Sequence, residues 1–413
     1  MEAVGHGVIY LMMFFVVLGA GAYMVKPDSP LGKEFKEGIV AIGHIFLPVG
    51  GVMVLVPLLV KVINATVAKG YAWLHADPAL AAGTFIAGDM GGYQLAHELA
   101  GSHGAWMMAF AASFTAGSTI VFSIPVGLAM TERQDHKFLA LGVMAGLLAI
   151  PFTVFVVVLI LGLSQVPTRE EISTTGPGTA PFDLSWGQVL LNLLPLALIM
   201  LVIALALRFL TNQTIRVFLI GGRALEMILT AALALSIVEY FTHVFSTLFG
   251  SWPLAPFIAD QEGQFRALEI AGYIGVMLSG AFPMVYAIRK GLAKPLGGLG
   301  RRVGISPDGM SGFLAASANV LALFRIVRLL PPKEKVLTIA FAVCSAFLFG
   351  DHLAFTANFQ PSMIAAMMGG KLFGGILAIF LAAWLVLPHA RRLEDEDREQ
   401  GVIGADEYAA ADS

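Results

Sequence analysis

A carboxylate lies between glycines within an otherwise apolar stretch of the chain. Asp89 stands in Gly88-Asp89-Met90-Gly91-Gly92, inside segment 80–100. An ionised carboxylate in apolar surroundings is costly unless it faces a cavity or a cation. The flanking glycines would also leave backbone carbonyls open to a cation. We predict that Asp89 binds a cation, with capping of an adjacent helix start as the structural alternative.

Two further polar clusters interrupt apolar segments. Asp351-His352 follows Gly350, and a carboxylate beside an imidazole can bind an amine or relay a proton. The alternative is a hydrogen-bonded pair that only fixes helix contacts. Asn319 and Ser317 interrupt segment 311–330 and can hydrogen-bond a hydroxyl group, or simply let helices approach closely.

Three more residues complete the set of polar candidates. Ser123 lies two residues before Pro125, which frees a backbone carbonyl in a kinked stretch. Tyr93 is a candidate wall of a cation site, with aromatic core packing as the alternative. Lys371, in the last apolar segment, is expected to pair with a carboxylate or to extend towards the membrane surface, and not to be a ligand. The predicted substrate-binding residues are Asp89, Asp351, His352, Asn319, Ser123, Tyr93 and Ser317.

Motifs of other function classes are missing from the sequence. It contains no GxxxxGK[ST] phosphate loop, no His-x-x-x-His or Cys-x-x-Cys metal spacing and no Gly-x-Ser-x-Gly elbow. We therefore predict no metal, no cofactor and no enzymatic activity. The net charge of −3 does not indicate a nucleic-acid partner. The single cysteine, Cys344, excludes a disulfide framework and is expected to be a packing residue.

The composition indicates the environment of these residues. Of 413 residues, 57% are hydrophobic and 13% charged, whereas soluble domains carry about a quarter charged residues. The apolar runs approach or exceed the roughly 20 residues that cross a bilayer as a helix. Because they do not alternate, we predict an all-α polytopic membrane protein and not a barrel. The predicted segments are 6–25, 38–62, 80–100, 104–130, 137–164, 187–207, 214–249, 267–289, 311–330, 335–358 and 361–388.

Two of these eleven segments differ from the others. Because glycine or small polar residues break 80–100 and 311–330, we predict re-entrant or broken hairpins there and about nine spanning helices elsewhere. With the N-terminus outside, this topology places nineteen Lys and Arg residues in the cytoplasm and four outside. Eleven spans with the N-terminus inside would place 11 of the same residues in the cytoplasm and 12 outside. The positive-inside rule thus predicts an inner-membrane protein with a cytoplasmic C-terminus.

The chain also contains a weak internal repeat. A shift of 229 positions superposes Gly43 on Gly272, Gly83 on Gly312 and Leu148-Ala149-Ile150 on Leu377-Ala378-Ile379. We predict two inverted transmembrane repeats, 1–164 and 187–388, joined by an extracytoplasmic loop, 165–186. A cytoplasmic acidic tail, 389–413, is expected to be solvated and mobile. Inverted repeats with broken helices that meet near the midplane are typical of secondary transporters, so we expect alternating access there.

Several longer motifs resemble one family, the ethanolamine-utilisation permeases (EutH). The motifs are Ala87-Gly88-Asp89-Met90-Gly91-Gly92, Thr119-Ile120-Val121-Phe122-Ser123-Ile124-Pro125, Ala281-Phe282-Pro283-Met284-Val285, Gly350-Asp351-His352-Leu353 and Gly370-Lys371-Leu372-Phe373-Gly374-Gly375. The resemblance implies passage of ethanolamine across the cytoplasmic membrane. Ethanolamine is a primary amine, protonated at neutral pH, with a hydroxyl group, which suits a buried carboxylate beside Asn or Ser.

The sequence leaves alternatives open. A channel-like ethanolamine facilitator, a transporter of another small polar solute, a membrane enzyme and a scaffold or sensor remain rivals. Coupling to protons, to sodium or to neither is compatible with two carboxylates. A homodimer or homotrimer is expected by analogy alone.

Overall fold

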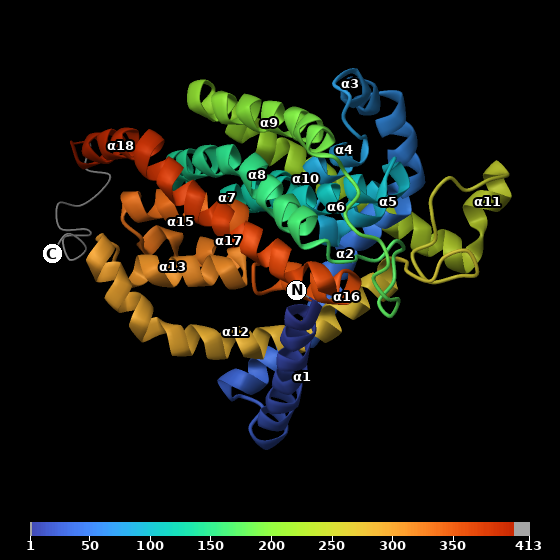
Figure 1. The fold of residues 1–413 in the computed structure, drawn as a ribbon, viewed down its shortest axis with the longest axis horizontal. Coiled ribbons are helices and arrows are strands. Elements are labelled where there is room, and N and C mark those ends of the chain that lie inside the picture. Colours follow the sequence, from blue (N-terminus) through green and yellow to red (C-terminus); the bar gives the residue numbers. More distant parts are fainter. Residues whose placement is uncertain (1, 400–413) are drawn as a thin grey trace.

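Helices make up almost all of the structure, a computed structural model that describes residues 2–399 (Figure 1). One isolated bridge, between Thr168 and Ala180, is the only β pairing in this range. Eight helical stretches within it are long and apolar enough to cross a membrane. They are α1 (Glu2–Val25), α2 (Pro30–Ala65), the stretch from α6 (His103–Ala112) to α7 (Ile124–Met130), α8 (His136–Ser164), α9 (Trp186–Phe209), α10 (Thr211–Thr242), most of α12 (Ala267–Val303), and the stretch from α17 (Ile364–Leu381), with the 3-10 turn before it, to α18 (Leu387–Glu399). The prediction of an all-α polytopic membrane protein is confirmed.

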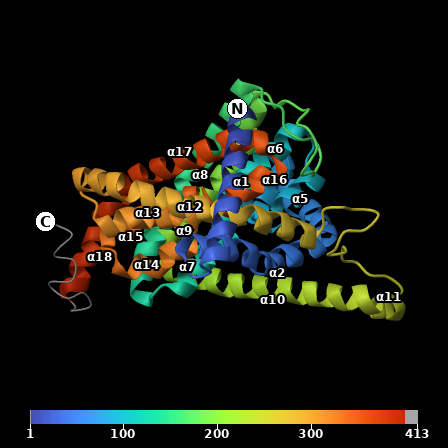
Figure 2. The same ribbon diagram turned by 90° about the horizontal axis from the view of Figure 1, so that it is seen from below.

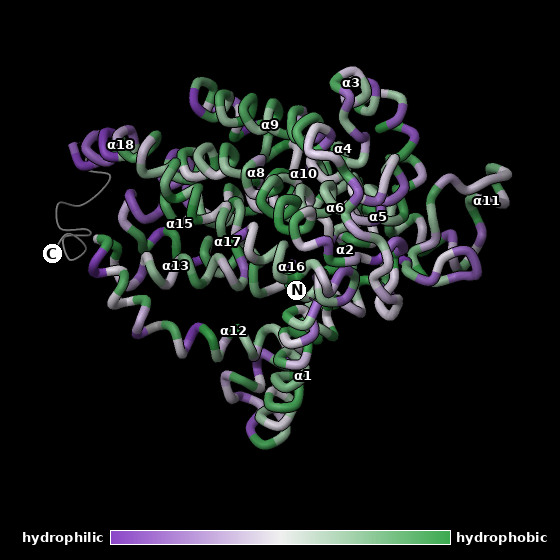
Figure 3. The backbone as a smooth tube through the Cα atoms, viewed as in Figure 1, coloured by the Kyte–Doolittle hydropathy of each residue, from purple (hydrophilic) through white to green (hydrophobic). Residues whose placement is uncertain are grey.

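Local sequence explains why these helices start where they do. Ser29 caps α2 and is followed by Pro30, whose missing N–H is not needed at that position. Ser185 forms a capping box with Gln188 at the start of α9. Between their ends the long helices are apolar around most of their circumference, as Figure 3 shows for α8 and α9. Such helices suit burial against lipid as well as protein.

Both predicted hairpins are present as pairs of short helices. In the first, α4 (Ala79–Phe85) packs against α5 (Gly92–Leu99), with a 3-10 turn at Gly88–Met90 between them. In the second, α13 (Pro307–Ala318) packs against α14 (Val320–Ile326) and the break falls at Asn319. Arms of 7 to 12 residues rise only about 10–18 Å, less than the ~30 Å of a bilayer core.

The segment expected to be one continuous helix at 335–358 is interrupted. This segment forms α15 (Pro332–Ser345) and α16 (Asp351–Phe359), separated by a non-helical stretch. Phe347, within that stretch, has a φ of 58°. The amides of Phe347 and Phe349 donate to the carbonyls of Ala316 and Ser317 at 3.1 and 2.9 Å. Tertiary hydrogen bonds to α13 therefore replace the helical ones, and the ninth predicted span is a broken pair.

Two other predicted ends also differ. Segment 214–249 is divided, because α10 ends at Thr242 and the short α11 (Val244–Phe249) follows. The expected mobile tail begins instead as helix α18 (Leu387–Glu399), whose Asp397 is ion-paired with Lys137. Charge pairing holds this part against the bundle. Residues 400–413 of the predicted tail lie outside the described range.

The helices form two packed groups, which can be followed in Figures 1 and 2. In the first group, α1, α2 and α12 pack on one another and α10 packs on α2. In the second, α8, α15 and α17 pack on one another and are joined by α4, α6 and α13. Both hairpins thus belong mainly to the second group.

The element bounds follow the predicted repeat spacing. Adding 229 to the bounds of α4, α5 and α6 gives 308–314, 321–328 and 332–341, which overlap α13, α14 and α15. The order of hairpin and following helix is therefore the same in both halves. An inverted relation between the halves stays a prediction.

Candidate functional site

Helix breaks from distant parts of the chain meet at one place. The stretch between α15 and α16 is hydrogen-bonded to the end of α13, next to the break at Asn319. A Cβ at Gly350 would collide with the carbonyl of Ala318, so glycine allows this approach. The 3-10 turn that carries Asp89 packs against α16, which begins at Asp351. Asp89, Asn319 and Asp351, far apart in sequence, therefore come together.

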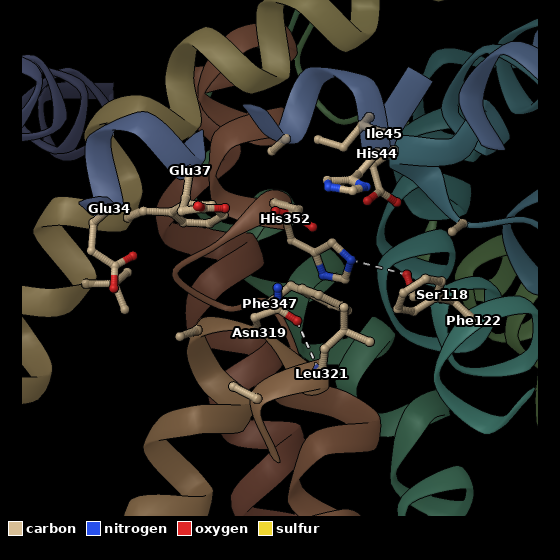
Figure 4. A pocket seen from close by; sticks show the side chains of 18 of the residues that line it. Glu34, Glu37, His44, Ile45, Ser118, Phe122, Asn319, Leu321, Phe347 and His352 are labelled. Carbon is tan, nitrogen blue, oxygen red and sulfur yellow. Dashed lines mark hydrogen bonds between the residues drawn. The ribbon is translucent and has the colours of Figure 1, made fainter. Parts of the chain in front are cut away.

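A cavity of about 580 Å³ opens at these breaks. It lies between the two helix groups, with α2 and α12 on one side and the hairpins and α16 on the other. Figure 4 shows His352, Asn319, Phe347 and Ser118 around its deep end. The main lining residues are Glu34, Glu37, His44, Asp89, Ser118, Phe122, Tyr286, Arg289, Asn319, Arg325, Phe347, Asp351 and His352. Exposed Glu37, Arg289 and Arg325 mark its open side.

Two polar atoms in this site have no hydrogen-bond partner among the residues that the structure describes. Asp89 Oδ1 and His352 Nδ1 are both buried and without a hydrogen bond among the described residues. A buried polar atom left unpaired costs about 1–3 kcal/mol, and more when charged. Their presence in a single cavity favours a ligand that supplies the missing hydrogen bonds.

The hydrogen bonds of Ser118 decide the role of His352 Nδ1. The Ser118 hydroxyl donates its hydrogen to the carbonyl of Ser113 at 2.9 Å, and its oxygen lies 3.2 Å from His352 Nε2. With that hydrogen used, Ser118 must accept from Nε2–H, so in the neutral imidazole Nδ1 is an acceptor. The ring also stacks on Phe114, with centroids 4.0 Å apart, which fixes its orientation.

The deep end of the cavity is rich in acceptors. Asp351 is the first residue of α16, where the helix dipole stabilises negative charge. Asn319 Oδ1 already accepts from the amide of Leu321 at 2.9 Å, which leaves the Asn319 amide donors for another group. The site thus offers two carboxylates and one imidazole nitrogen as acceptors, and one side-chain amide group as a donor. This set matches a ligand that has several N–H donors and one oxygen acceptor.

Within the described part of the chain, neither carboxylate forms a close ion pair. Among the described residues, no Lys or Arg nitrogen lies within 4.0 Å of a carboxylate oxygen of Asp89 or Asp351. Arg289 and Arg325 line the same cavity without pairing with them. The site can therefore accept a positive charge from outside the protein.

Three predicted site residues lie elsewhere. Ser123 borders a separate small void with Thr119 and Val143. Ser317 is buried and its hydroxyl donates back to the carbonyl of Phe313 at 2.9 Å. Tyr93 is fully buried in an aromatic cluster beyond the deep end, not in the cavity wall. The structure thus brings together Asp89, Asp351, His352 and Asn319 of the predicted set.

Sequence reasoning missed Ser118, Phe122 and Phe347. Ser118 lies between two π-helical segments, Ser113–Gly117 and Thr119–Ser123. π-Helical turns are frequent at functional sites, yet they carry no dependable sequence signal. His44 could have been found as a polar residue within a long apolar helix, which is a general signal of function in membranes.

The side opposite the cavity mouth is closed. Tyr93 packs against Trp106, Phe110 and Phe355, with ring centroids 4.7 to 5.4 Å apart. Gln360 Nε2 donates to the Tyr93 hydroxyl at 2.8 Å and to the Arg169 carbonyl at 2.9 Å. This layer separates the deep end of the cavity from the loop between α8 and α9.

Arg169 attaches that loop to α16. Its guanidinium donates to the carbonyls of Asn358 and Phe359 at 2.6 and 3.2 Å, at the C-terminal end of the helix. Burial lowers the pKa of Arg169 from its ordinary value, although arginine stays protonated at neutral pH. A cation at a helix C-terminus is favourable, so the contact stabilises the closed side.

Comparison with known proteins identifies the family. The model described as "Ethanolamine utilisation protein, EutH" matches residues 4–385. A relative from Listeria monocytogenes, named "Probable ethanolamine permease EutH", is 34% identical over 379 residues, which cover 92% of this chain and 93% of the relative. The protein of the same name from Escherichia coli is 33% identical over 403 residues, covering 92% and 95%.

A further relative is also similar to most of this chain. A Bacillus subtilis relative, named "Uncharacterized protein YxeR", is 33% identical over 383 residues and carries no function in its name. No solved structure matches this chain. The family match over nearly the whole chain agrees with the resemblance of its motifs, and the chain therefore belongs to the ethanolamine utilisation protein EutH family.

Proposed function

We propose that the protein is a permease for a small cationic amino alcohol, with ethanolamine as the substrate. The observation that carries this proposal is a pair of buried acceptors, Asp89 Oδ1 and His352 Nδ1, that have no hydrogen-bond partner among residues 2–399. They share a cavity in which no Lys or Arg of the same range forms an ion pair with Asp89 or Asp351. An alkylammonium ion supplies both the charge and the N–H donors. The names of the Listeria and Escherichia relatives support the same substrate.

Each end of the substrate has a partner in the site. The ammonium group binds Asp89, with Asp351 as the second cation contact, because charge-assisted hydrogen bonds offset its desolvation. The hydroxyl oxygen accepts from the free amide of Asn319, and His352 Nδ1 accepts from the hydroxyl or the ammonium group. Ser123, Ser317 and Tyr93 support neighbouring helices and do not contact the substrate.

Transport proceeds by alternating access at this site. The cavity lies between two helix groups, is open beside Arg289 and Arg325, and is closed by Tyr93, Gln360 and Arg169. Movement of the hairpin-bearing group against α1, α2, α10 and α12 would exchange the open and closed sides. With the N-terminus on the outer side of the cell membrane, the open side of the cavity faces the cytoplasm and segment 165–186 lies on the outer side.

The proposal also covers the internal repeat, the absence of chemistry on the substrate and the assembly of the protein. The halves 1–164 and 187–388 act as inverted repeats, with hairpins that enter from opposite faces. The protein performs no chemistry on its substrate and requires no cofactor. A homodimer or homotrimer is the proposed assembly.

Flux of labelled ethanolamine in proteoliposomes tests this function. We expect saturable uptake that unlabelled ethanolamine accelerates from the opposite side, as a carrier requires. Ethylamine, which lacks the hydroxyl, should compete less well, and ethylene glycol, which lacks the charge, should not compete. Imposed proton and sodium gradients then identify the coupling ion. Unsaturable flux without exchange would instead identify a channel, and binding without flux a sensor.

A further inference from the structure

Lys371 is a buried cation to which the transport cycle described above assigns no role. Its side chain, on α17, is 1% exposed, so it does not extend to the membrane surface as the sequence analysis allowed. Within the described residues, no carboxylate oxygen lies within 4.0 Å of its ammonium group. The Lys371 Nζ donates to the backbone carbonyl of Phe114 at 2.6 Å.

Phe114 places Lys371 next to the substrate site. Its ring stacks on His352, and a Cβ at Gly88 would lie only 2.9 Å from its Cε1 atom. Gly88 directly precedes Asp89, so Phe114 touches both sides of the deep end of the cavity. Among the described residues, the charge of Lys371 interacts with Asp89, His352 and Cys344.

Packing holds Lys371 in place. The Ser345 hydroxyl donates to the carbonyl of Lys371 at 2.7 Å. A Cβ at Gly374 or at Gly375 would collide with Thr153 or Ser345, which shows how closely α17 approaches α8 and α15. These contacts fix the backbone that carries Lys371, and its buried ammonium group is directed at the carbonyl of Phe114.

We propose that Lys371 is the fixed counter-cation of Asp89. In the unloaded carrier its charge compensates the buried carboxylate of Asp89, with which no Lys or Arg among the described residues forms an ion pair. In the loaded carrier it opposes the substrate ammonium, which weakens binding and favours release. Lys371 is thus a positioning residue that sets the affinity for cations, and this role rests on the proposed function of Asp89. Removal of one member of a buried charge pair leaves the other uncompensated.

The sign of an affinity change tests the inference. Purified Lys371→Met protein should bind ethanolamine roughly tenfold more tightly than wild type by calorimetry, because the opposing charge is gone. Lys371→Arg, which keeps the charge, should bind within about threefold of wild type. A role in packing alone predicts weaker binding in Lys371→Met, and that result would overturn the inference.

A second measurement does not depend on ethanolamine. The thermal unfolding of Asp89→Asn, Lys371→Met and the double variant forms a double-mutant cycle. Each single change should lower the unfolding temperature, and the double variant should recover much of that loss. Strictly additive losses would contradict a charge pair, as would a double variant that fails to fold while Asp89→Asn folds. If the two substitutions are coupled in this cycle but the wild-type protein binds no ethanolamine, the charge pair is supported and ethanolamine is excluded as the substrate.

Discussion

Asp89→Asn removes one charge from the deep end of the cavity with almost no change in shape. Asp89 lies on the turn between α4 and α5, and its buried Oδ1 has no hydrogen-bond partner in the part of the chain that the structure describes. Asparagine keeps one acceptor oxygen at this position but cannot neutralise an ammonium ion. The substitution therefore separates the charge of Asp89 from its packing.

The expected loss of affinity follows from an ammonium ion in contact with the Asp89 carboxylate. Two unit charges about 4 Å apart attract by about 4 kcal/mol at an effective dielectric of about 20. Desolvation of the ammonium and the oxygen retained by asparagine offset part of this. A net loss of about 2–3 kcal/mol remains, which agrees with the value of hydrogen bonds to charged groups. That corresponds to a 30- to 150-fold weaker binding of ethanolamine.

Calorimetry on purified protein and labelled uptake in proteoliposomes measure this loss. Glu98→Gln is the matched control, because it makes the same chemical change on the same hairpin at an exposed position. We expect the control to bind within about twofold of wild type. Wild-type affinity and uptake in Asp89→Asn, at normal membrane levels, would refute the role of Asp89 in the site.

Three further outcomes follow from the same structure. Asp351→Asn should weaken ethanolamine binding about tenfold by calorimetry. This loss is smaller than that of Asp89→Asn because Asp351 is the second cation contact. Unchanged affinity would show that Asp351 only stabilises the start of α16. Arg169→Gln should lower the unfolding temperature by a few degrees, since the C-terminal carbonyls of α16 lose a charged donor. An unchanged unfolding temperature would show that this contact does not stabilise the closed side. Glu37→Cys, at the cavity mouth, should react with a membrane-impermeant thiol reagent in inside-out vesicles and not in intact cells, because the mouth faces the cytoplasm in the proposed topology. The native Cys344 is buried and should not react. Reaction in intact cells and not in inside-out vesicles would invert the proposed topology.

The sequence predicted the membrane helices and both hairpins because their causes are local. A run of apolar residues requires a helix in lipid whatever its neighbours are. Gly91 takes a φ of 97°, a conformation that glycine adopts easily, and Asn319 caps the helix that follows it. These residue types therefore marked the breaks before any tertiary contact was known. Asp89 was found for the same reason, as a charge in an apolar segment.

The rest of the site depends on contacts between distant segments. Nothing local marks the break at Phe347, since its amide is satisfied by α13, some thirty residues earlier. Likewise, Ser118 is a polar residue of ordinary type until folding places its hydroxyl oxygen 3.2 Å from Nε2 of His352, which the sequence did predict in the site. Tyr93 was expected in the cavity wall, but the cluster around Trp106 and Phe355 takes it to the closed side.

By itself, then, the sequence determined which segments enter the membrane, where two of them break and which carboxylate is out of place. Only the tertiary structure decided which of these polar atoms share a cavity, which side of that cavity is closed, and that Lys371 lies behind it. The reason is physical. Solvation by lipid acts on each segment separately, whereas the pairing of a buried polar atom depends on what other segments bring within about 3 Å of it.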